Sequence, residues 1–276
     1  MAAAAVLSPD VLRVALLPAC DARTAVLLLG AARRLRGVVA QVQVFEVAIK
    51  RSQALGSLGA RGLATAVAAM AGLRNLRLGL SYQEIGADAA CNLAGAVSRL
   101  RGLRSVSVDL HRNGLGDIGG RAWAVAVGEL PDLSHLDLRL GFNSLGGETI
   151  MGFITALGAP SAARLSEVQL ALDINERIGG EAVCRLVQAV ASLNGLQRWR
   201  LDLGACGVAN EHAQLIAEAL AGPRTDASEV SSLASPLWQH AELDLRGNGL
   251  RASARKLLVK AAMCLGAQGR QCIFRA

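Results

Sequence analysis

Aromatic residues are scarce in this chain. Phe, Trp and Tyr together make up 3% of the 276 residues, whereas 52% of the residues are hydrophobic. A core must therefore be built mainly from Leu, Val and Ala, which suits many small, similar layers better than one bulky centre. This length and apolar content exclude a disordered chain and allow one extended domain or two compact ones. The composition favours a repetitive architecture.

Lysine is also rare. Only Lys50, Lys256 and Lys260 occur among the 29 basic residues, and the formal net charge is +7. A basic surface attracts nucleic acid or an anionic membrane. The basic residues are spread along the chain, however, and they form no stripe interleaved with aromatic residues. This distribution argues against a nucleic-acid partner.

The cysteines lack the spacing of a metal site or a disulfide framework. The six residues are Cys20, Cys91, Cys184, Cys206, Cys264 and Cys272. They form no CxxC pair and stand at no zinc-like spacing from histidine, so we expect free thiols, no metal and no cofactor. No apolar run reaches the roughly 20 residues that span a bilayer, and no signal-peptide pattern is present. We therefore expect a soluble protein of the cytoplasm or nucleus.

One glycine-rich stretch, GLGDIG at residues 114–119, has the spacing of a dinucleotide-binding turn. It follows an expected strand over residues 106–110 and precedes a helical pattern, with Asp137 near the end of the next expected strand. Glycine also recurs at this point of the repeat described below, whereas the full GxGxxG spacing occurs once. A recurring backbone turn explains the glycines, because glycine tolerates positive φ. We therefore discard the dinucleotide site.

The sequence repeats about every 30 residues. Five regular segments begin at Leu73, Leu103, Leu133, Leu165 and Leu196, and irregular copies lie near Val42 and Trp238. Alternating apolar residues such as Leu136 and Leu138 predict a strand in each unit, and apolar residues four apart then predict a helix. We expect about seven strand–turn–helix units over residues 41–276.

These columns resemble leucine-rich repeats, most closely the longer ribonuclease-inhibitor type with a full helix in each unit. The resemblance implies an α/β solenoid, a curved horseshoe with a parallel sheet on its concave side and helices on its convex side. In that family an Asn or Cys in the turn bonds the backbone of neighbouring coils. Residues that match this slot are Asn113, Asn143, Cys206 and Asn248. Gln83 departs from it, and inserted residues near Gln53 and Asn175 blur it.

The N-terminal residues, 1–40, do not fit the repeat. Residues 7–38 predict helices separated near residues 18–21, and they resemble an F-box with Ser8 at the usual proline. The matching residues are Leu7, Asp10, Val11 and Leu12, followed by Ala32, Arg33, Arg34 and Leu35. The resemblance implies an N-terminal helical segment whose apolar face is covered by a Skp-type adaptor of a cullin ubiquitin ligase. We expect this face at Leu12, Leu16, Leu27 and Leu35.

Two other interpretations of this segment stay open. Its helices could do no more than cap the open end of the solenoid, because every repeat array requires a polar terminal unit. Alternatively, the segment is a mitochondrial presequence, since five arginines in it outnumber Asp10 and Asp21.

Three columns of residues alternate with the buried strand positions and are expected to face outward on the concave side. Their most charged members are His135, Asp137, Arg139, Arg198, Arg200, Asp202, His240, Glu242 and Asp244. We expect ion pairs along the columns, with Arg139 near Asp109 and Arg200 near Glu242. We also expect a protein partner over these charged rows.

His135 and Asp137 lie on one row, an arrangement that invites a catalytic interpretation. The only hydroxyl nucleophiles in neighbouring rows are Ser105 and Ser107, and an open face excludes no water. We therefore predict a binding protein, not an enzyme.

The sequence thus predicts a protein–protein interaction scaffold, and in its sharper form the substrate receptor of a cullin-based ubiquitin ligase. One alternative is a structural accessory subunit of a large assembly, including an organellar one. Another is a GTPase-activating repeat protein that uses Arg112 or Arg246 as an arginine finger. Residues 223–237, rich in Ser and Pro, predict a surface loop.

Overall fold

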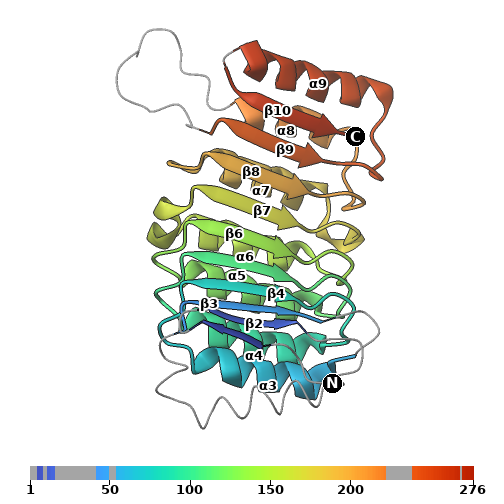
Figure 1. Cartoon of the computed structure of the whole chain (residues 1–276). Coiled ribbons are helices and arrows are strands. Elements are labelled where there is room, and N and C mark those ends of the chain that lie inside the picture. Colours follow the sequence, from blue (N-terminus) through green and yellow to red (C-terminus); the bar gives the residue numbers. More distant parts are fainter. Residues whose placement is uncertain (1–4, 9–10, 16–41, 50–53, 222–237, 268) are drawn as a thin grey trace.

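The computed structural model describes residues 5–8, 11–15, 42–49, 54–221, 238–267 and 269–276. Within these residues the chain is α/β, with strands and helices that alternate along one continuous array (Figure 1). Ten strands form a single sheet in chain order, from β1 to β10. β1 is antiparallel to β2, and all later neighbours are parallel.

The strands are short and nearly equal in length. They are β1 Ala5–Ser8, β2 Val11–Ala15, β3 Val44–Ala48, β4 Asn75–Gly79, β5 Ser105–Asp109, β6 His135–Arg139, β7 Glu167–Ala171, β8 Arg198–Asp202, β9 His240–Asp244 and β10 Gln271–Arg275. The helices are α3 Gly56–Ala68, α4 Gly86–Ser98, α5 Gly116–Gly128, α6 Gly147–Leu157, α7 Gly180–Ala191, α8 His212–Ala221 and α9 Ala252–Ala267. Two short 3-10 helices, η2 Pro160–Arg164 and η3 Glu176–Ile178, lie on either side of β7.

Each unit buries one face of its strand and one face of its helix. In β6, Leu136 and Leu138 are buried while His135 and Arg139 are exposed, as the alternating pattern predicts. The helices pack against this apolar side and against one another in sequence order, and none of the described helices covers the other side of the sheet (Figure 1). The core is therefore a continuous slab between sheet and helices.

Small residues let neighbouring helices lie close together. A Cβ atom on Gly120 of α5 would stand 2.6 Å from Oγ1 of Thr149 in α6. A Cβ atom on Gly128 would stand 3.3 Å from Cα of Ala156, and one on Gly152 would stand 3.1 Å from Cβ of Ala124. Glycine thus leaves room for the close approach of these helices, most clearly at Gly120.

Buried amide side chains join the turns that follow the strands. Oδ1 of Asn143 accepts hydrogen bonds from the backbone N–H groups of Asn113 at 2.8 Å and Leu115 at 3.4 Å in the preceding coil. Its Nδ2 donates to the carbonyl of Leu110 at 2.9 Å and to that of Leu140 at 3.0 Å. One side chain therefore satisfies buried backbone groups in two coils at once.

The same arrangement recurs along the array, and we call it the amide ladder. Its amide members are Gln83, Asn113, Asn143, Asn175 and Asn248, and at one place the thiol of Cys206 takes this role and donates to the carbonyl of Leu172 at 3.2 Å. Gln83 belongs to it despite its longer side chain, because its Oε1 accepts a bond from the N–H of Leu55 at 3.0 Å. Asn175 also belongs to it, although inserted residues obscure its register in the sequence. Gln53 lies outside the described residues.

The helix expected at the start of residues 7–38 is wrong, because residues 11–15 form strand β2. β2 lies parallel to β3, with Val11 beside Val44 and Ala15 beside Ala48. Valines at two of these five positions favour an extended backbone, and pairing satisfies the backbone groups that the edge of β3 would leave open. Leu12 thus belongs to a sheet strand.

Leu16, Leu27 and Leu35, also predicted to form the adaptor-binding face, lie outside the described residues. The loop predicted over residues 223–237 also lies outside them.

The buried leucines of the strands should carry much of the stability. We expect Leu138→Ala or Leu170→Ala to lower the free energy of unfolding by about 2–5 kcal/mol, through lost burial and the cavity left behind. Leu58→Ala on α3 is the matched control, because Leu58 is 80% exposed. Urea denaturation followed by circular dichroism measures both effects. Equal losses at Leu138 and Leu58 would contradict the assignment of the core.

Candidate functional site

The uncovered face of the sheet carries three straight columns of side chains, as the sequence predicts. The first runs through Asn75, Ser105, His135, Glu167, Arg198 and His240. The second runs through Arg77, Ser107, Asp137, Gln169, Arg200 and Glu242. The third runs through Gly79, Asp109, Arg139, Ala171, Asp202 and Asp244. Strand register therefore brings every predicted charged row onto one surface.

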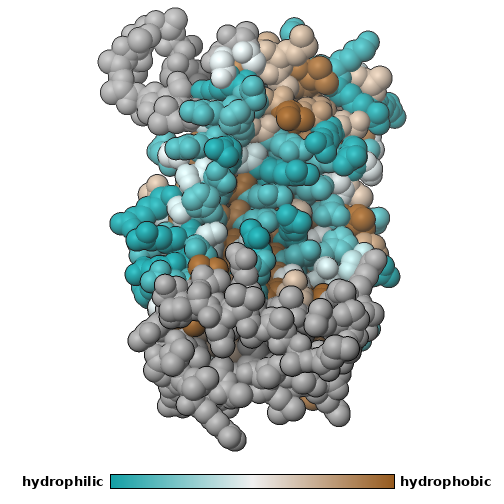
Figure 2. All heavy atoms as spheres, in the orientation of Figure 1, coloured by the Kyte–Doolittle hydropathy of each residue, from teal (hydrophilic) through white to brown (hydrophobic). Residues whose placement is uncertain are grey.

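Where the described residues can be seen, this face is mostly hydrophilic (Figure 2). A hollow of about 460 Å³ lies over β4 to β10. Its floor includes the second column, together with His135, Glu167 and Arg198 from the first. The hollow is wide and open to solvent, a shape that suits the surface of a macromolecule better than an enclosed small molecule.

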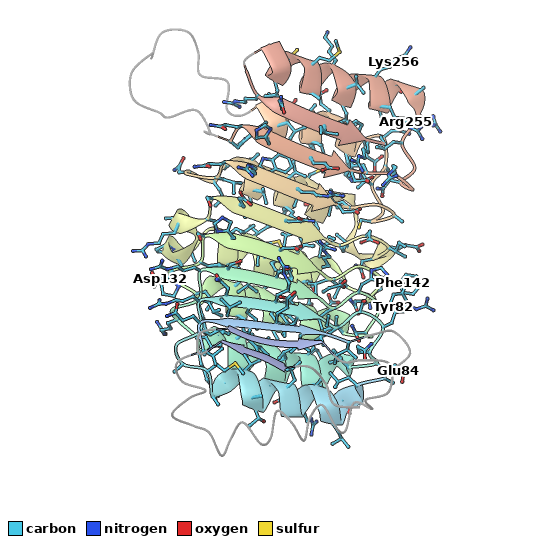
Figure 3. All side chains as sticks on the ribbon, viewed as in Figure 1. Tyr82, Glu84, Asp132, Phe142, Arg255 and Lys256 are labelled. Atoms are coloured by element: carbon cyan, nitrogen blue, oxygen red, sulfur yellow. The ribbon has the colours of Figure 1, made fainter. Side chains whose placement is uncertain are left out.

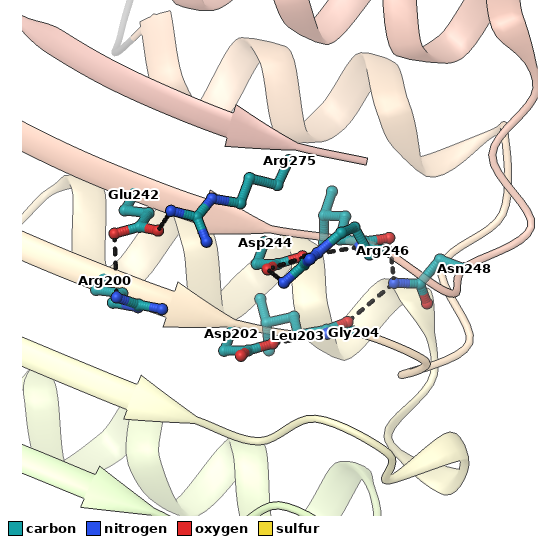
Figure 4. Close-up of polar contacts among 10 residues, drawn as sticks. Arg200, Asp202, Leu203, Gly204, Glu242, Asp244, Arg246, Asn248 and Arg275 are labelled. Atoms are coloured by element: carbon teal, nitrogen blue, oxygen red, sulfur yellow. Dashed lines mark hydrogen bonds and ion pairs between the residues drawn. The ribbon is translucent and has the colours of Figure 1, made fainter.

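Ion pairs connect neighbouring strands across this face. Nη1 of Arg198 lies 3.2 Å from Oε1 of Glu167, and Nη1 of Arg200 lies 3.3 Å from Oε2 of Glu242. Glu242 also pairs with Arg275 of β10, at 2.7 Å (Figure 4). The predicted contact between Arg200 and Glu242 is confirmed, and the added contact with Arg275 fixes the glutamate from both sides.

Arg139 lies beside Asp109 in the same column, as predicted, but the ion pair expected between them is not formed. Although the two residues are register partners, Nε of Arg139 pairs at 3.2 Å with Asp137 on its own strand. Asp109 instead accepts a hydrogen bond from the backbone N–H of His111 at 3.0 Å, which forms a local turn. Asp137 also accepts a bond from the hydroxyl of Ser107 at 3.0 Å. Asp137 thus fixes the side chains of both Arg139 and Ser107.

The two aspartates that end β8 and β9 have opposite shifts in pKa. Burial raises the pKa of Asp202, and the nearby carboxylate of Asp173 raises it further. Burial also opposes ionisation of Asp244, but hydrogen bonds from Arg246, with Nε at 3.0 and 2.9 Å, hold its pKa below the ordinary value (Figure 4). Arg246 is therefore committed to Asp244, which argues against its use as an arginine finger.

Sequence reasoning missed one adjacent pair, Ser134 and His135. Oγ of Ser134 lies 2.8 Å from Nδ1 of His135 and donates to the carbonyl of Arg104 at 3.0 Å. A hydroxyl has one proton, and a carbonyl can only accept, so Ser134 accepts its second bond from His135. A nucleophile activated by a base needs the opposite direction of donation. The pair therefore joins coils and has no arrangement for nucleophilic catalysis.

In the described part of the chain, no group of three or more His, Cys, Asp or Glu side chains is placed to hold a metal ion. No helix there is long and apolar enough to cross a membrane.

Comparison of the chain with protein-family models and with curated proteins gives no match. The function of the site must therefore be argued from its geometry.

The raised pKa of Asp202 leads to a pH-dependent prediction. A carboxyl group whose pKa is higher in the folded than in the unfolded chain destabilises the fold wherever it is ionised. Asp202→Asn should therefore raise the free energy of unfolding at pH 7. The gain should shrink as the pH falls through the raised pKa and vanish below about 4, where both states are protonated. Urea titrations across this pH range measure the gain, and a gain that grows on acidification would contradict the assignment.

The cysteines give a second prediction. Burial raises the pKa of the Cys206 thiol to about 12, whereas Cys264 is exposed on α9. Only the thiolate reacts with alkylating reagents, and burial also blocks access. Iodoacetamide at pH 7.5, with the folded protein, should modify Cys264 and leave Cys206 intact. Mass spectrometry of the two peptides measures this, and equal labelling after denaturation is the control.

Proposed function

We propose that this chain is a leucine-rich-repeat solenoid of the ribonuclease-inhibitor-like type and that it acts as a protein-binding scaffold. The repeat of about 30 residues, the strand and helix in each unit and the amide ladder support the family assignment. In this architecture the strands line the concave side and the helices the convex side.

The observation that carries the proposed function is the uncovered face of the sheet. Neighbouring strands lie about 4.8 Å apart, so the seven strands from β4 to β10 offer a surface about 29 Å wide. Exposed arginines stand on it in fixed rows beside carboxylates that are mostly half-buried, while Asp244, which was predicted to face outward, is buried beneath Arg246. Such a face matches the dimensions and charge patterning of protein interfaces, and its charges would contribute specificity and association rate.

The later rows are the preferred contact region. The side chains of Arg198 and Arg200 are 62% and 41% exposed, and they project from one strand two residues apart. Each ion pair uses Nη1, and a guanidinium has five N–H donors in all. Acidic groups of a partner can therefore meet both arginines while the pairs with Glu167 and Glu242 hold them in place.

The ubiquitin-ligase role stays a prediction, because it depends on residues 7–38, of which the structure describes 7–8 and 11–15. The strand at residues 11–15 favours an end-covering role for that part of the segment. A structural accessory subunit would use the same protein-binding face, so identification of the partner separates these roles.

We expect Arg198→Glu combined with Arg200→Glu to abolish partner binding while the fold survives, because exposed ion pairs contribute about 0–1 kcal/mol each. Full-length tagged protein is captured from cells, and quantitative mass spectrometry compares what copurifies with each variant. A direct binding titration with the purified partner then measures the loss and its salt dependence.

Arg185→Glu is the matched control for this experiment. Arg185 lies on α7, is 55% exposed and pairs with Glu181, so Arg185→Glu makes one such reversal on the helical side. A partner lost on reversal of Arg185, or retained on reversal of Arg198 and Arg200, would contradict the proposed binding face.

A further inference from the structure

The turns that follow the strands require an unusual backbone. The residue just before each member of the amide ladder has a positive φ. These residues are Tyr82 at 60°, Arg112 at 54°, Phe142 at 58°, Ile174 at 55°, Ala205 at 51° and Gly247 at 74°. Glycine adopts this left-handed conformation without steric cost, whereas other residues are strained in it, most of all β-branched ones. Glycine would therefore be the best residue for the fold at every one of these positions.

Four consecutive coils nevertheless carry large side chains there, and we call Tyr82, Arg112, Phe142 and Ile174 the edge stripe. It lies at the side of the sheet where the strands end, and Figure 3 shows Tyr82 and Phe142 along that side. Burial does not offset the strain, because Phe142 is 43% and Ile174 46% exposed. Local strain that the fold does not require is a mark of function.

Arg112 is held rigidly within the edge stripe. Its Cζ lies 5.4 Å from the ring centroid of Tyr82 and 4.8 Å from that of Phe142. With two rings this close to the guanidinium, its N–H groups are the part left to meet a partner. Arg112 is exposed, and in the described part of the chain no carboxylate forms an ion pair with it. The rim is therefore positioned for an anion that comes from outside the chain.

We propose that the edge stripe binds an extended segment of a protein partner, with an Asp or Glu of that segment on Arg112 and a large apolar side chain over Phe142 and Ile174. Arg112 and Ile174 are two coils apart, or about 10 Å, which an extended peptide spans with about three residues. This inference builds on the proposed protein-binding role, but it uses residues beside the open face and not those on it.

The surrounding charges favour a carboxylate over a phosphate. Asp109 ends the strand that leads into Arg112, and Asp173 immediately precedes Ile174. A singly charged carboxylate meets less repulsion from these two groups than a phosphate, which carries nearly two charges. The same carboxylates disfavour an anionic membrane.

The test uses peptides from a random library displayed on phage and selected on the full chain. Enriched sequences should share an Asp or Glu about three residues from a large apolar residue. Arg112→Gln should weaken the synthetic peptides roughly tenfold or more, the scale of one charge-assisted bond. Replacing the peptide carboxylate by its amide should weaken binding to the parent protein. The same replacement should cause no further loss of affinity for the Arg112→Gln variant, because both changes remove the same interaction.

Ile174→Gly separates binding from structure. Glycine relieves the strain at this position, so the melting temperature should stay equal or rise while peptide affinity falls. A structural role for Ile174 predicts the reverse, a lower melting temperature with unchanged affinity, and that result would overturn the proposal. So would an absence of enriched peptides, equal affinity for Arg112→Gln, or tighter binding when phosphoserine replaces the acidic residue.

The variant with Arg198→Glu and Arg200→Glu distinguishes the two proposed surfaces. Peptides that depend on Arg112 and bind this variant normally support the edge stripe. Peptides that lose binding only in this variant support the open face alone and refute the edge stripe.

Discussion

The structure depends on how each coil satisfies the polar backbone of the next. A turn packed between two other turns buries N–H and carbonyl groups that no helix or strand can reach, and leaving them without partners would cost on the order of 1–3 kcal/mol each. The amide ladder supplies the missing partners, as Asn143 does for Asn113 and Leu110. Because each ladder side chain reaches a fixed distance, it also sets the register between coils. Straight columns on the open face follow from that register.

The regular units could be predicted from the sequence because strand, turn and helix obey the same periodic pattern in each. All six residues of each outward column between β4 and β9 were predictable for this reason. Prediction from the sequence failed where a single repeat unit departs from this pattern. Gln83 differs from asparagine by one methylene, yet its carbonyl reaches the same N–H. Strands β2 and β10 lie outside the regular copies, and their assignment depends on pairing with a neighbour, which no local pattern reveals.

Side-chain contacts on the open face were less predictable than its columns. Register placed Arg139 beside Asp109, but the choice of partner was decided by a local turn that occupies Asp109 and by Asp137 on the same strand. The edge stripe escaped prediction for a different reason. Nothing in the sequence distinguishes its residues, and only the backbone conformation shows that glycine would suit the fold better at Phe142 and Ile174.

The small residues between α5 and α6 affect the curvature of the open face, which lies on the other side of the sheet. Helices usually pack 8–10 Å apart and strands about 4.8 Å apart, so stacking both in one array forces it to bend toward the strands. Gly120 and Gly128 let the helices approach, which reduces this difference and flattens the array. The spacing of the helices thus determines the curvature of the open face of the sheet. Variation at these glycines would change the width of the proposed binding surface without altering any residue on it.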